Sequence, residues 1–207
     1  MLRRTLISIT TALSGLLLAG HSHAAPAVGQ DAPAFTLTDT SGKTVRLGDF
    51  KGKHVVLEWL NPGCPYVRKH YSGANMQGTQ KEVTGKGVVW LAINSTDRDH
   101  HDYLAPKQLA AWMSGQKAAA SLTLMDEDGT VGQAYGARTT PHMYIISPQG
   151  KLVYAGGIDS IPSARADDIK TAVNYVKQGV SQALAGQPLT NATTRPYGCS
   201  VKYKSGA

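Results

Sequence analysis

The stretch that decides the fold is HVVLEWLNPGCPYV, residues 54–67, in which an apolar run leads directly into a cysteine. Because residues 54–60 form a short and mainly apolar run, they are predicted to form a buried β-strand. Pro65 is typical of the first helical position, so Cys64 is predicted to lie where a strand turns into a helix. The unpaired N–H groups and the dipole of a helix start favour a thiolate. We therefore expect Cys64 to be a redox-active nucleophile; the alternative is a buried structural cysteine.

The pattern on either side of this stretch alternates between strands and helices. It predicts an α/β fold with a central mixed β-sheet flanked by helices on both faces, preceded by an N-terminal β-hairpin. Further strands are predicted at 88–94, 122–124, 143–146 and 152–155, and helices at 65–81, 106–118, 129–135 and 164–183. The first helix is expected to be weak or broken because it contains Gly73 and Gly78. Residues 25–186 are predicted to form one domain, and residues 187–207 an extended C-terminal tail that carries the second cysteine, Cys199.

The first 24 residues have the features of a signal peptide. Met1–Arg4 is short and basic, residues 5–20 are apolar, and Ser22-His23-Ala24 is a small-x-small cleavage site. We expect cleavage near Ala24, export to a periplasm and no stable membrane insertion. Both cysteines would then lie in an oxidising compartment. The formal net charge of +7 is spread along the chain, so no nucleic-acid partner is expected.

Several segments together resemble the thioredoxin superfamily, and within it the peroxiredoxin-like (alkyl hydroperoxide reductase/thiol-specific antioxidant, redoxin) group. They are the opening VGQDAPAFTL (28–37), the strand entry GKHVVL (52–57), the turn CPYV (64–67), TPHMYII (140–146) and the tail GCSVK (198–202). The resemblance covers roughly residues 28–203 and implies a thioredoxin-like fold and thiol-dependent redox activity. Two positions depart from the family pattern. Asn61 stands where a peroxiredoxin has Thr or Ser, and Val67 stands where a thioredoxin has its second cysteine.

The resemblance and the residue types together suggest roles for residues around the Cys64 turn. Pro141 would follow a cis peptide bond beside Cys64, and Pro65, Tyr66, Thr140 and Pro141 would contact the substrate. Arg138 could approach the thiolate and lower its pKa, or be a surface arginine. Asn61 could donate its amide to a peroxide, or cap the turn. Glu58, within the apolar strand, could move protons for the thiol if it is buried, or face water at a strand edge.

Cys199 is interpreted as the resolving cysteine, which forms a disulfide with Cys64 after Cys64 has reacted. A permanent disulfide that ties down the tail, and no pairing at all, are the alternatives. The substrate would be a hydroperoxide or a protein disulfide, and an external dithiol would be the reductant. No cofactor and no metal site are predicted. A copper-binding protein, using Cys64 with His70 and Met76 or with Cys199, and a redox-inert thioredoxin-fold module remain the alternatives from other classes.

Overall fold

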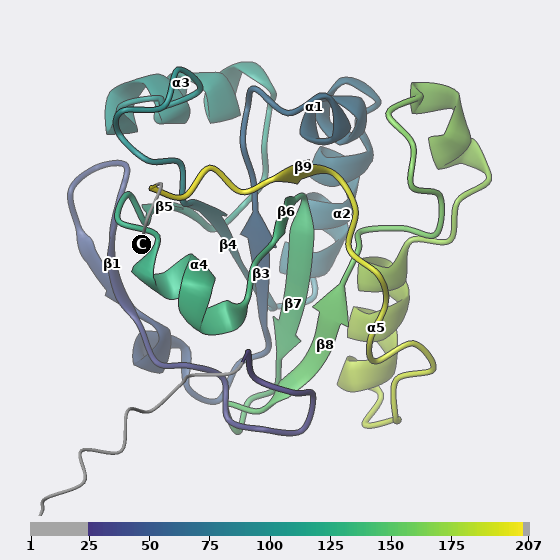
Figure 1. Cartoon of the computed structure of the whole chain (residues 1–207). Helices are drawn as coiled ribbons and strands as arrows, with labels where there is room; N and C mark the ends of the chain where they lie inside the picture. The colour runs from purple at the N-terminus through teal and green to yellow at the C-terminus, as the bar shows by residue number, and fades with distance from the viewer. Residues whose placement is uncertain (1–24, 205–207) are drawn as a thin grey trace, which may run out of the picture.

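The computed structural model describes residues 25–204 and contains a seven-stranded mixed sheet with helices on both faces (Figure 1). The strands follow the order β2-β1-β5-β4-β3-β7-β8 across the sheet. Their bounds are β1 (Thr36–Asp39), β2 (Thr44–Arg46), β3 (Val55–Trp59), β4 (Val89–Asn94), β5 (Leu122–Met125), β7 (His142–Ile146) and β8 (Leu152–Gly156). Two short strands, β6 (Thr139–Thr140) and β9 (Cys199–Ser200), form a separate antiparallel pair. The predicted fold class, including the N-terminal hairpin β1–β2, is confirmed.

The helices are α1 (Pro65–Ser72), α2 (Asn75–Thr84), α3 (Pro106–Gly115), α4 (Thr130–Tyr135) and α5 (Tyr175–Leu184), with 3-10 turns at Leu47–Phe50 and Ala166–Lys170. One face of the sheet packs against α1, α2, α3 and α5 through buried side chains such as Val56, Trp90 and Ile145. The other face packs against α4 and Phe35 through side chains such as Leu57 and Leu91. Strands buried on both faces explain why their sequences read as continuous apolar runs.

The central strand β3 positions the site. It pairs in parallel with β4 and antiparallel with β7, and all five of its residues are buried. The chain leaves β3 at its carboxyl end and turns into α1. This carboxyl edge of the sheet is where ligands bind in open α/β sheets. Cys64 lies at this edge, as the sequence predicts.

One predicted helix is broken as expected, and another differs from the structure. The helix at 65–81 is divided into α1 and α2, where Gly73 ends α1 and Ala74 takes a left-handed conformation (φ 54°). The long helix at 164–183 is wrong in its first half, and α5 begins only at Tyr175. There the backbone of Val173 pairs with Ser160 instead of continuing a helix, and the Asn174 side chain caps α5 by accepting from the Lys177 amide at 3.0 Å.

The tail leaves α5 after Gly186 and crosses the sheet in an extended conformation (Figure 1, yellow). It passes beside β8, where Thr193 bridges to Ala155, and then runs between β6 and α1 toward α4. At its far end the Tyr203 hydroxyl donates to the Ala137 carbonyl at 2.7 Å. Several backbone groups of the tail are thus paired with the domain.

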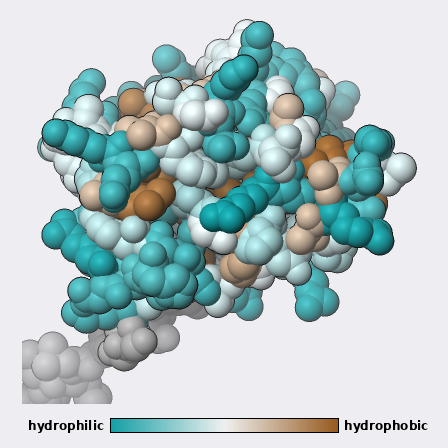
Figure 2. Space-filling view, turned by 90° about the horizontal axis from the view of Figure 1, so that it is seen from above, coloured by the Kyte–Doolittle hydropathy of each residue, from teal (hydrophilic) through white to brown (hydrophobic). Residues whose placement is uncertain are grey.

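Within residues 25–204, no helix is long and apolar enough to cross a membrane. The predicted signal peptide, residues 1–24, lies outside the described residues. Figure 2 looks onto the end of the molecule where α1, α3 and β9 lie, and its surface there is mainly hydrophilic with small, separated hydrophobic patches. Single exposed apolar residues of this kind are normal for a protein surface.

Candidate active site

Cys64 is built into the junction between β3 and α1. It is the residue that caps α1, its backbone is extended (φ −76°, ψ 123°), and Pro65 takes the first helical position. Only 1% of Cys64 is exposed. A thiol at a helix start faces unpaired N–H groups and the positive end of the dipole, and both stabilise a thiolate. The local geometry therefore suits a nucleophilic cysteine.

The turn before Cys64 is held by Asn61. The Asn61 side-chain oxygen accepts from the Gly63 amide at 2.7 Å, and the Asn61 carbonyl accepts from the Cys64 amide at 3.0 Å. The side-chain nitrogen of Asn61 donates to the Asp102 carboxylate at 3.1 Å. A Cβ on Gly63 would lie 2.4 Å from that carboxylate, so the close approach of Asp102 requires glycine. Asn61 thus caps the turn, which was one of its two predicted roles.

The loop before β7 lies against Cys64. The Thr140–Pro141 peptide bond is cis, as the family resemblance predicts. The Cys64 thiol donates to the Thr140 carbonyl at 3.0 Å. This contact joins residues far apart in sequence and brings β6 beside the thiol.

Cys199 lies on the other side of the same thiol. Strand β9 pairs with β6 so that Cys199 is opposite Thr140, and the two sulfur atoms of Cys64 and Cys199 lie 2.8 Å apart. Both cysteines are thiols in this structure. A disulfide brings two sulfurs to about 2.05 Å, so a small side-chain movement would join them. The predicted encounter of Cys64 with Cys199 is therefore present within a single chain.

The approach of the tail depends on Gly198. Its φ of +134° favours glycine, and a Cβ there would lie 2.0 Å from the Thr140 carbonyl oxygen. Burial and the adjacent Cys64 sulfur raise the pKa of Cys199 to about 12, while Lys202 lowers it. Two thiolates so close would repel each other, so the reduced pair retains a proton on Cys199.

Glu58 is fully buried beneath the site, which excludes the water-facing position considered for it. Its carboxyl group accepts hydrogen bonds from Tyr71 at 2.9 Å, Gln80 at 3.0 Å and Trp90 at 2.8 Å. Burial raises the pKa of Glu58 to about 7, although the three hydrogen bonds oppose this shift. A carboxyl that titrates near neutral pH suits proton transfer, but its hydrogen-bond partners among the described residues do not include Cys64. Its catalytic role stays a prediction.

The remaining predicted site residues surround the cysteine pair less closely. Pro65 is exposed and Tyr66 is half-buried, with its ring 5.9 Å from that of Tyr197. Arg138 is exposed; its carbonyl accepts from the Val201 amide, and its side chain makes no hydrogen bond or ion pair among residues 25–204. Substrate contacts by Pro65 and Tyr66 and an effect of Arg138 on the thiol stay predictions. Asp102 and Tyr197 also belong to the site, although neither was predicted from the sequence. The only signal was that Tyr197 lies close to Cys199 in the sequence.

The copper site considered from Cys64, His70 and Met76 does not fit the geometry. Both ring nitrogens of His70 are engaged, one with Asn75 at 2.8 Å and the other with Tyr197 at 3.1 Å. Within the described part of the chain, one cluster has metal-ligating atoms close together, namely His100, His101 and Asp102. Its Asp102 carboxylate is already bonded to Asn61, and the His100 ring accepts from the Asp102 amide at 3.0 Å. These groups thus shape the loop beside the turn.

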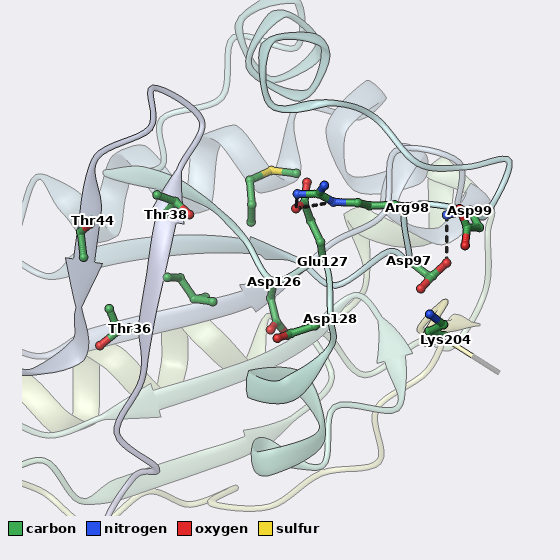
Figure 3. A pocket seen from close by; sticks show the side chains of 12 residues that line it. Thr36, Thr38, Thr44, Asp97, Arg98, Asp99, Asp126, Glu127, Asp128 and Lys204 are labelled. Atoms are coloured by element: carbon green, nitrogen blue, oxygen red, sulfur yellow. Dashed lines mark hydrogen bonds and ion pairs between the residues drawn. The ribbon is translucent and has the colours of Figure 1, made fainter. Parts of the chain in front are cut away.

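A surface depression of about 630 Å³ is lined by residues that do not include either cysteine (Figure 3). Its lining includes the carboxylates of Asp97, Asp99, Asp126, Glu127 and Asp128. Arg98 forms an ion pair with Glu127 across it. The Asp126 carboxyl accepts from the Ser95 hydroxyl at 2.5 Å and the Gly132 amide at 2.8 Å, and burial raises its pKa to about 6. The acidic groups are thus partly satisfied within the protein, and no thiol chemistry resides there.

Comparison with known proteins agrees with this geometry. Residues 28–155 match the model of the AhpC/TSA family, which is more than half of the chain. The chain belongs to the AhpC/TSA family. This confirms the resemblance inferred from the sequence. The matched region includes Cys64 and Pro141 but ends before Asp159, Tyr197 and Cys199, so the tail is not part of the family match.

Two relatives have names that describe redox proteins. The chain is 29% identical over 126 residues to the thiol-disulfide oxidoreductase ResA of Bacillus subtilis, and this alignment covers 60% of the chain. It is 32% identical over 114 residues to a Haemophilus influenzae protein, bcp, which is described by name as a peroxiredoxin, and this alignment covers 53% of the chain. The chain spans 64% of the length of each relative.

A solved structure covers more of the molecule. An uncharacterized conserved protein from Geobacillus kaustophilus is 28% identical and superposes with a TM-score of 0.74 over 87% of this chain and 94% of its own. This overlap extends beyond the length of the family match, so the full architecture recurs in another protein. Because that protein is itself uncharacterized, the likeness supports the architecture and assigns no activity.

Proposed function

We propose that this AhpC/TSA-family protein is a thiol oxidoreductase that uses Cys64 as its nucleophile and Cys199 as its resolving cysteine. The distance of 2.8 Å between their sulfur atoms carries the proposal. Thiol–disulfide exchange with a polypeptide or small disulfide is the leading reaction. The resemblance to a relative named thiol-disulfide oxidoreductase supports this choice.

The reaction proceeds in two exchanges. The Cys64 thiolate attacks one sulfur of the substrate disulfide, and the other sulfur leaves as a thiolate. Cys199 then attacks the Cys64 sulfur of the mixed disulfide, releases the second substrate thiolate and gives up its proton to it. Two electrons pass from the cysteine pair to the substrate, and the Cys64–Cys199 disulfide remains. An external dithiol would reduce it again.

The raised pKa of Cys199 suits this order of events. In the reduced pair the Cys64 sulfur is one of the causes that hold the proton on Cys199. Once Cys64 is bonded to the substrate it carries no charge, so this cause disappears and Cys199 ionises more readily. The first step therefore prepares the second.

Peroxide reduction is the second candidate. It is favoured by the resemblance to the relative named as a peroxiredoxin, bcp. It is also favoured by the burial of Cys64, because a small oxidant reaches a buried thiol more easily than a polypeptide does. Cys64 would attack the peroxide O–O bond and become a sulfenic acid, with water or an alcohol as product. Cys199 would then form the disulfide and release water. The turn argues against peroxide reduction. Asn61 provides no hydroxyl for the peroxide, and its side-chain oxygen already accepts from the Gly63 amide.

The test compares the two oxidants on the reduced protein. Stopped-flow tryptophan fluorescence and free-thiol titration follow its reaction with oxidised glutathione and, separately, with hydrogen peroxide. We expect the wild type to reach the Cys64–Cys199 disulfide, Cys199→Ser to stop at a glutathione adduct on Cys64, and Cys64→Ser to be inert. A Cys64→Ser variant that reacts like the wild type would remove the proposal. A peroxide reaction no faster than that of a free thiol would leave disulfide exchange alone.

The remaining parts of the proposal concern the place of action and the domains. The basic, apolar and small-residue segments of positions 1–24 support export with cleavage near Ala24, and a periplasm would supply an oxidising setting. We further propose that residues 25–186 form the thioredoxin-like domain and residues 187–207 a tail that delivers Cys199. N-terminal sequencing of the protein from a periplasmic fraction tests the cleavage position.

A further inference from the structure

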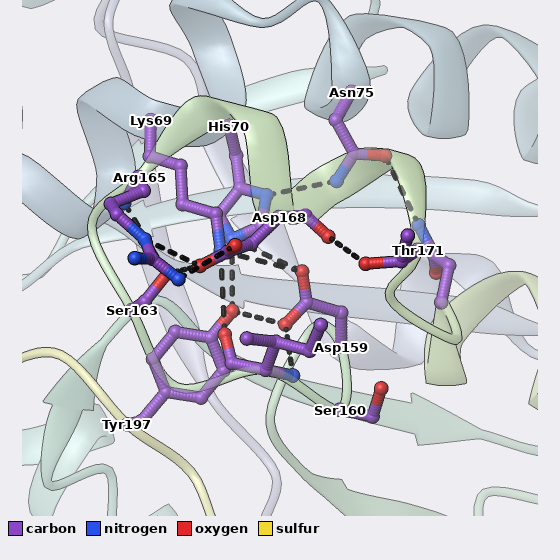
Figure 4. Close-up of polar contacts among 12 residues, drawn as sticks. Lys69, His70, Asn75, Asp159, Ser160, Ser163, Arg165, Asp168, Thr171 and Tyr197 are labelled. Carbon is purple, nitrogen blue, oxygen red and sulfur yellow. Dashed lines mark hydrogen bonds and ion pairs between the residues drawn. The ribbon is translucent and has the colours of Figure 1, made fainter.

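A buried polar cluster lies under the tail, between α1 and the segment that follows β8 (Figure 4). We name it the tail clamp, and it consists of Lys69, His70, Asp159 and Tyr197. Lys69, His70 and Asp159 are 3%, 0% and 3% exposed, and Tyr197 is 8% exposed. Charged side chains are rarely buried to this extent unless they are paired. The cluster is not used by either chemical step described above.

The hydrogen bonds of the clamp run in one direction. The Asn75 side chain donates to Nδ1 of His70 at 2.8 Å, so the proton of the His70 ring is on Nε2. Nε2 then donates to the Tyr197 hydroxyl at 3.1 Å, and that hydroxyl donates to Oδ1 of Asp159. Burial, together with the charge of Lys69, lowers the pKa of His70 to about 3, which keeps the ring neutral. Tyr197 is therefore bonded on both sides, as acceptor and as donor.

Charge reinforces this arrangement. The second oxygen of Asp159, Oδ2, is buried and makes no hydrogen bond among the described residues, but it lies 3.8 Å from both Lys69 Nζ and His70 Nε2. Lys69 also donates to the Ile161 carbonyl at 3.3 Å, and its ammonium lies 5.7 Å from the centre of the Tyr197 ring. Because unpaired buried charges are costly, Asp159 retains its partners strongly, and the Tyr197 hydroxyl is one of them.

The clamp connects the two elements that carry the cysteines. Lys69 and His70 are on α1, the helix that begins directly after Cys64, and Tyr197 comes two residues before Cys199. The tail is fixed after Cys199 by backbone pairing of Val201 with Arg138. Before Cys199, the Tyr197 hydroxyl provides the link that runs directly to the Cys64 helix.

We propose that the tail clamp is a positioning device for the second exchange: Lys69, His70 and Asp159 hold Tyr197 so that Cys199 stays against Cys64. This rests on the proposed function for its role in turnover. The clamp does not touch the reacting sulfurs. It raises the effective concentration of the Cys199 thiol at the Cys64 sulfur, and leaves the first attack by Cys64 unaffected.

The experiment uses Tyr197→Phe, which keeps the ring and removes only the hydroxyl. Tyr175→Phe is the matched control, because Tyr175 is a half-buried tyrosine of the same region whose hydroxyl makes no hydrogen bond within residues 25–204. Two quantities are measured on the reduced proteins. One is the rate of Cys199 alkylation by iodoacetamide, read by peptide mass spectrometry. The other is the equilibrium constant of the Cys64–Cys199 disulfide against glutathione.

We expect Tyr197→Phe to alkylate at Cys199 about tenfold faster and to form the disulfide about tenfold less favourably, since hydrogen bonds to charged groups have effects of this size. Tyr175→Phe should stay within about twofold of the wild type in both. The first exchange, measured with Cys199→Ser and with Cys199→Ser/Tyr197→Phe, should proceed at the same rate.

The clamp proposal would be overturned if the Cys199 alkylation rate and the disulfide equilibrium constant of Tyr197→Phe both stayed within about twofold of the wild type. It would also be overturned if Tyr197→Phe slowed both exchanges equally. Asp159→Ala, measured in the same way, removes the acceptor of the Tyr197 hydroxyl and so provides a second disruption of the same hydrogen bond. If the wild type forms no Cys64–Cys199 disulfide, the proposed function fails, and the alkylation rate still decides whether the clamp positions Cys199.

Discussion

The two cysteines meet at one point but are placed there by opposite means. Cys64 depends on its neighbours in sequence: a buried strand, an Asn61-capped turn and a helix that starts at Pro65. Cys199 belongs to a two-residue strand at the end of an extended tail, and its position depends on contacts with β6 and α1. The nucleophile is thus held by local structure, while its partner is held only by tertiary contacts. A partner held in this way can separate from the nucleophile without unfolding the domain.

The largest expected effect comes from disrupting the tertiary contacts that hold Cys199. Gly198→Ala would place a Cβ 2.0 Å from the Thr140 carbonyl oxygen, at a φ of +134°. We expect the strand pair β6–β9 to open and the equilibrium for the Cys64–Cys199 disulfide to fall about a hundredfold, measured against glutathione.

Gly186→Ala is the matched control, because Gly186 also has a positive φ (+67°) but nothing within 4 Å of its Cβ position. It should change the equilibrium by less than about threefold. An equal effect of both substitutions would mean that tail flexibility, rather than the close approach to Thr140, determines the pairing.

The next effect concerns the carboxyl beneath the Cys64 strand. The folded protein holds the Glu58 proton up to a pKa of about 7, against an ordinary value of 4.5. Between these pH values the folded state binds more protons than the unfolded state, so Glu58 lowers the free energy of unfolding as pH rises. The change is about 3 kcal/mol and should be absent in Glu58→Gln.

Urea unfolding of the wild type and of Glu58→Gln between pH 4.5 and 8 measures this change in the free energy of unfolding. Burial lowers the pKa of His70 and of His142 to about 3, and both contribute the opposite slope below their ordinary pKa of 6.5. These histidines are common to both proteins, so the difference between the two curves isolates Glu58. Parallel curves would contradict the expectation.

A pH profile of Cys64 exchange that inflects near 7 only with Glu58 present would support the predicted role of Glu58 in proton transfer.

A smaller effect tests the local support of Cys64. Asn61→Ala removes the acceptor of the Gly63 amide and the donor to Asp102. We expect a loss of about 1 kcal/mol in the free energy of unfolding and a few-fold change in the rate of Cys64 alkylation. Asp102→Asn, which keeps an oxygen for Asn61, should have less effect on both, and the reverse order would show that Asp102 rather than the cap controls the turn.

The smallest effect is expected at the acidic depression. Arg98 is exposed and pairs with Glu127 on the surface. Because exposed ion pairs contribute little, Arg98→Ala should leave the thermal midpoint and both exchanges unchanged within error. A clear loss of exchange in this variant would connect the depression to the cysteine pair, and would show that the tail is also controlled from its far end.

The sequence alone determined much of this protein, because its strongest signals are local. The apolar runs of β3 and β4, the Pro65 helix start and the hairpin β7–β8 report burial and backbone preference residue by residue. They predict the mixed sheet and place Cys64 at its edge. The first half of the helix at 164–183 was predicted wrongly because pairing of Val173 with Ser160 overrode the helical periodicity.

Only the tertiary structure decided what surrounds the thiol. The 2.8 Å contact between Cys64 and Cys199, the packing of Gly198 on Thr140 and the clamp on Tyr197 each join segments distant in sequence. The sequence suggested that Cys199 could reach Cys64, but it contains no periodicity that reports which buried charges face each other. Such contacts follow from how elements pack, and packing depends on the whole chain at once.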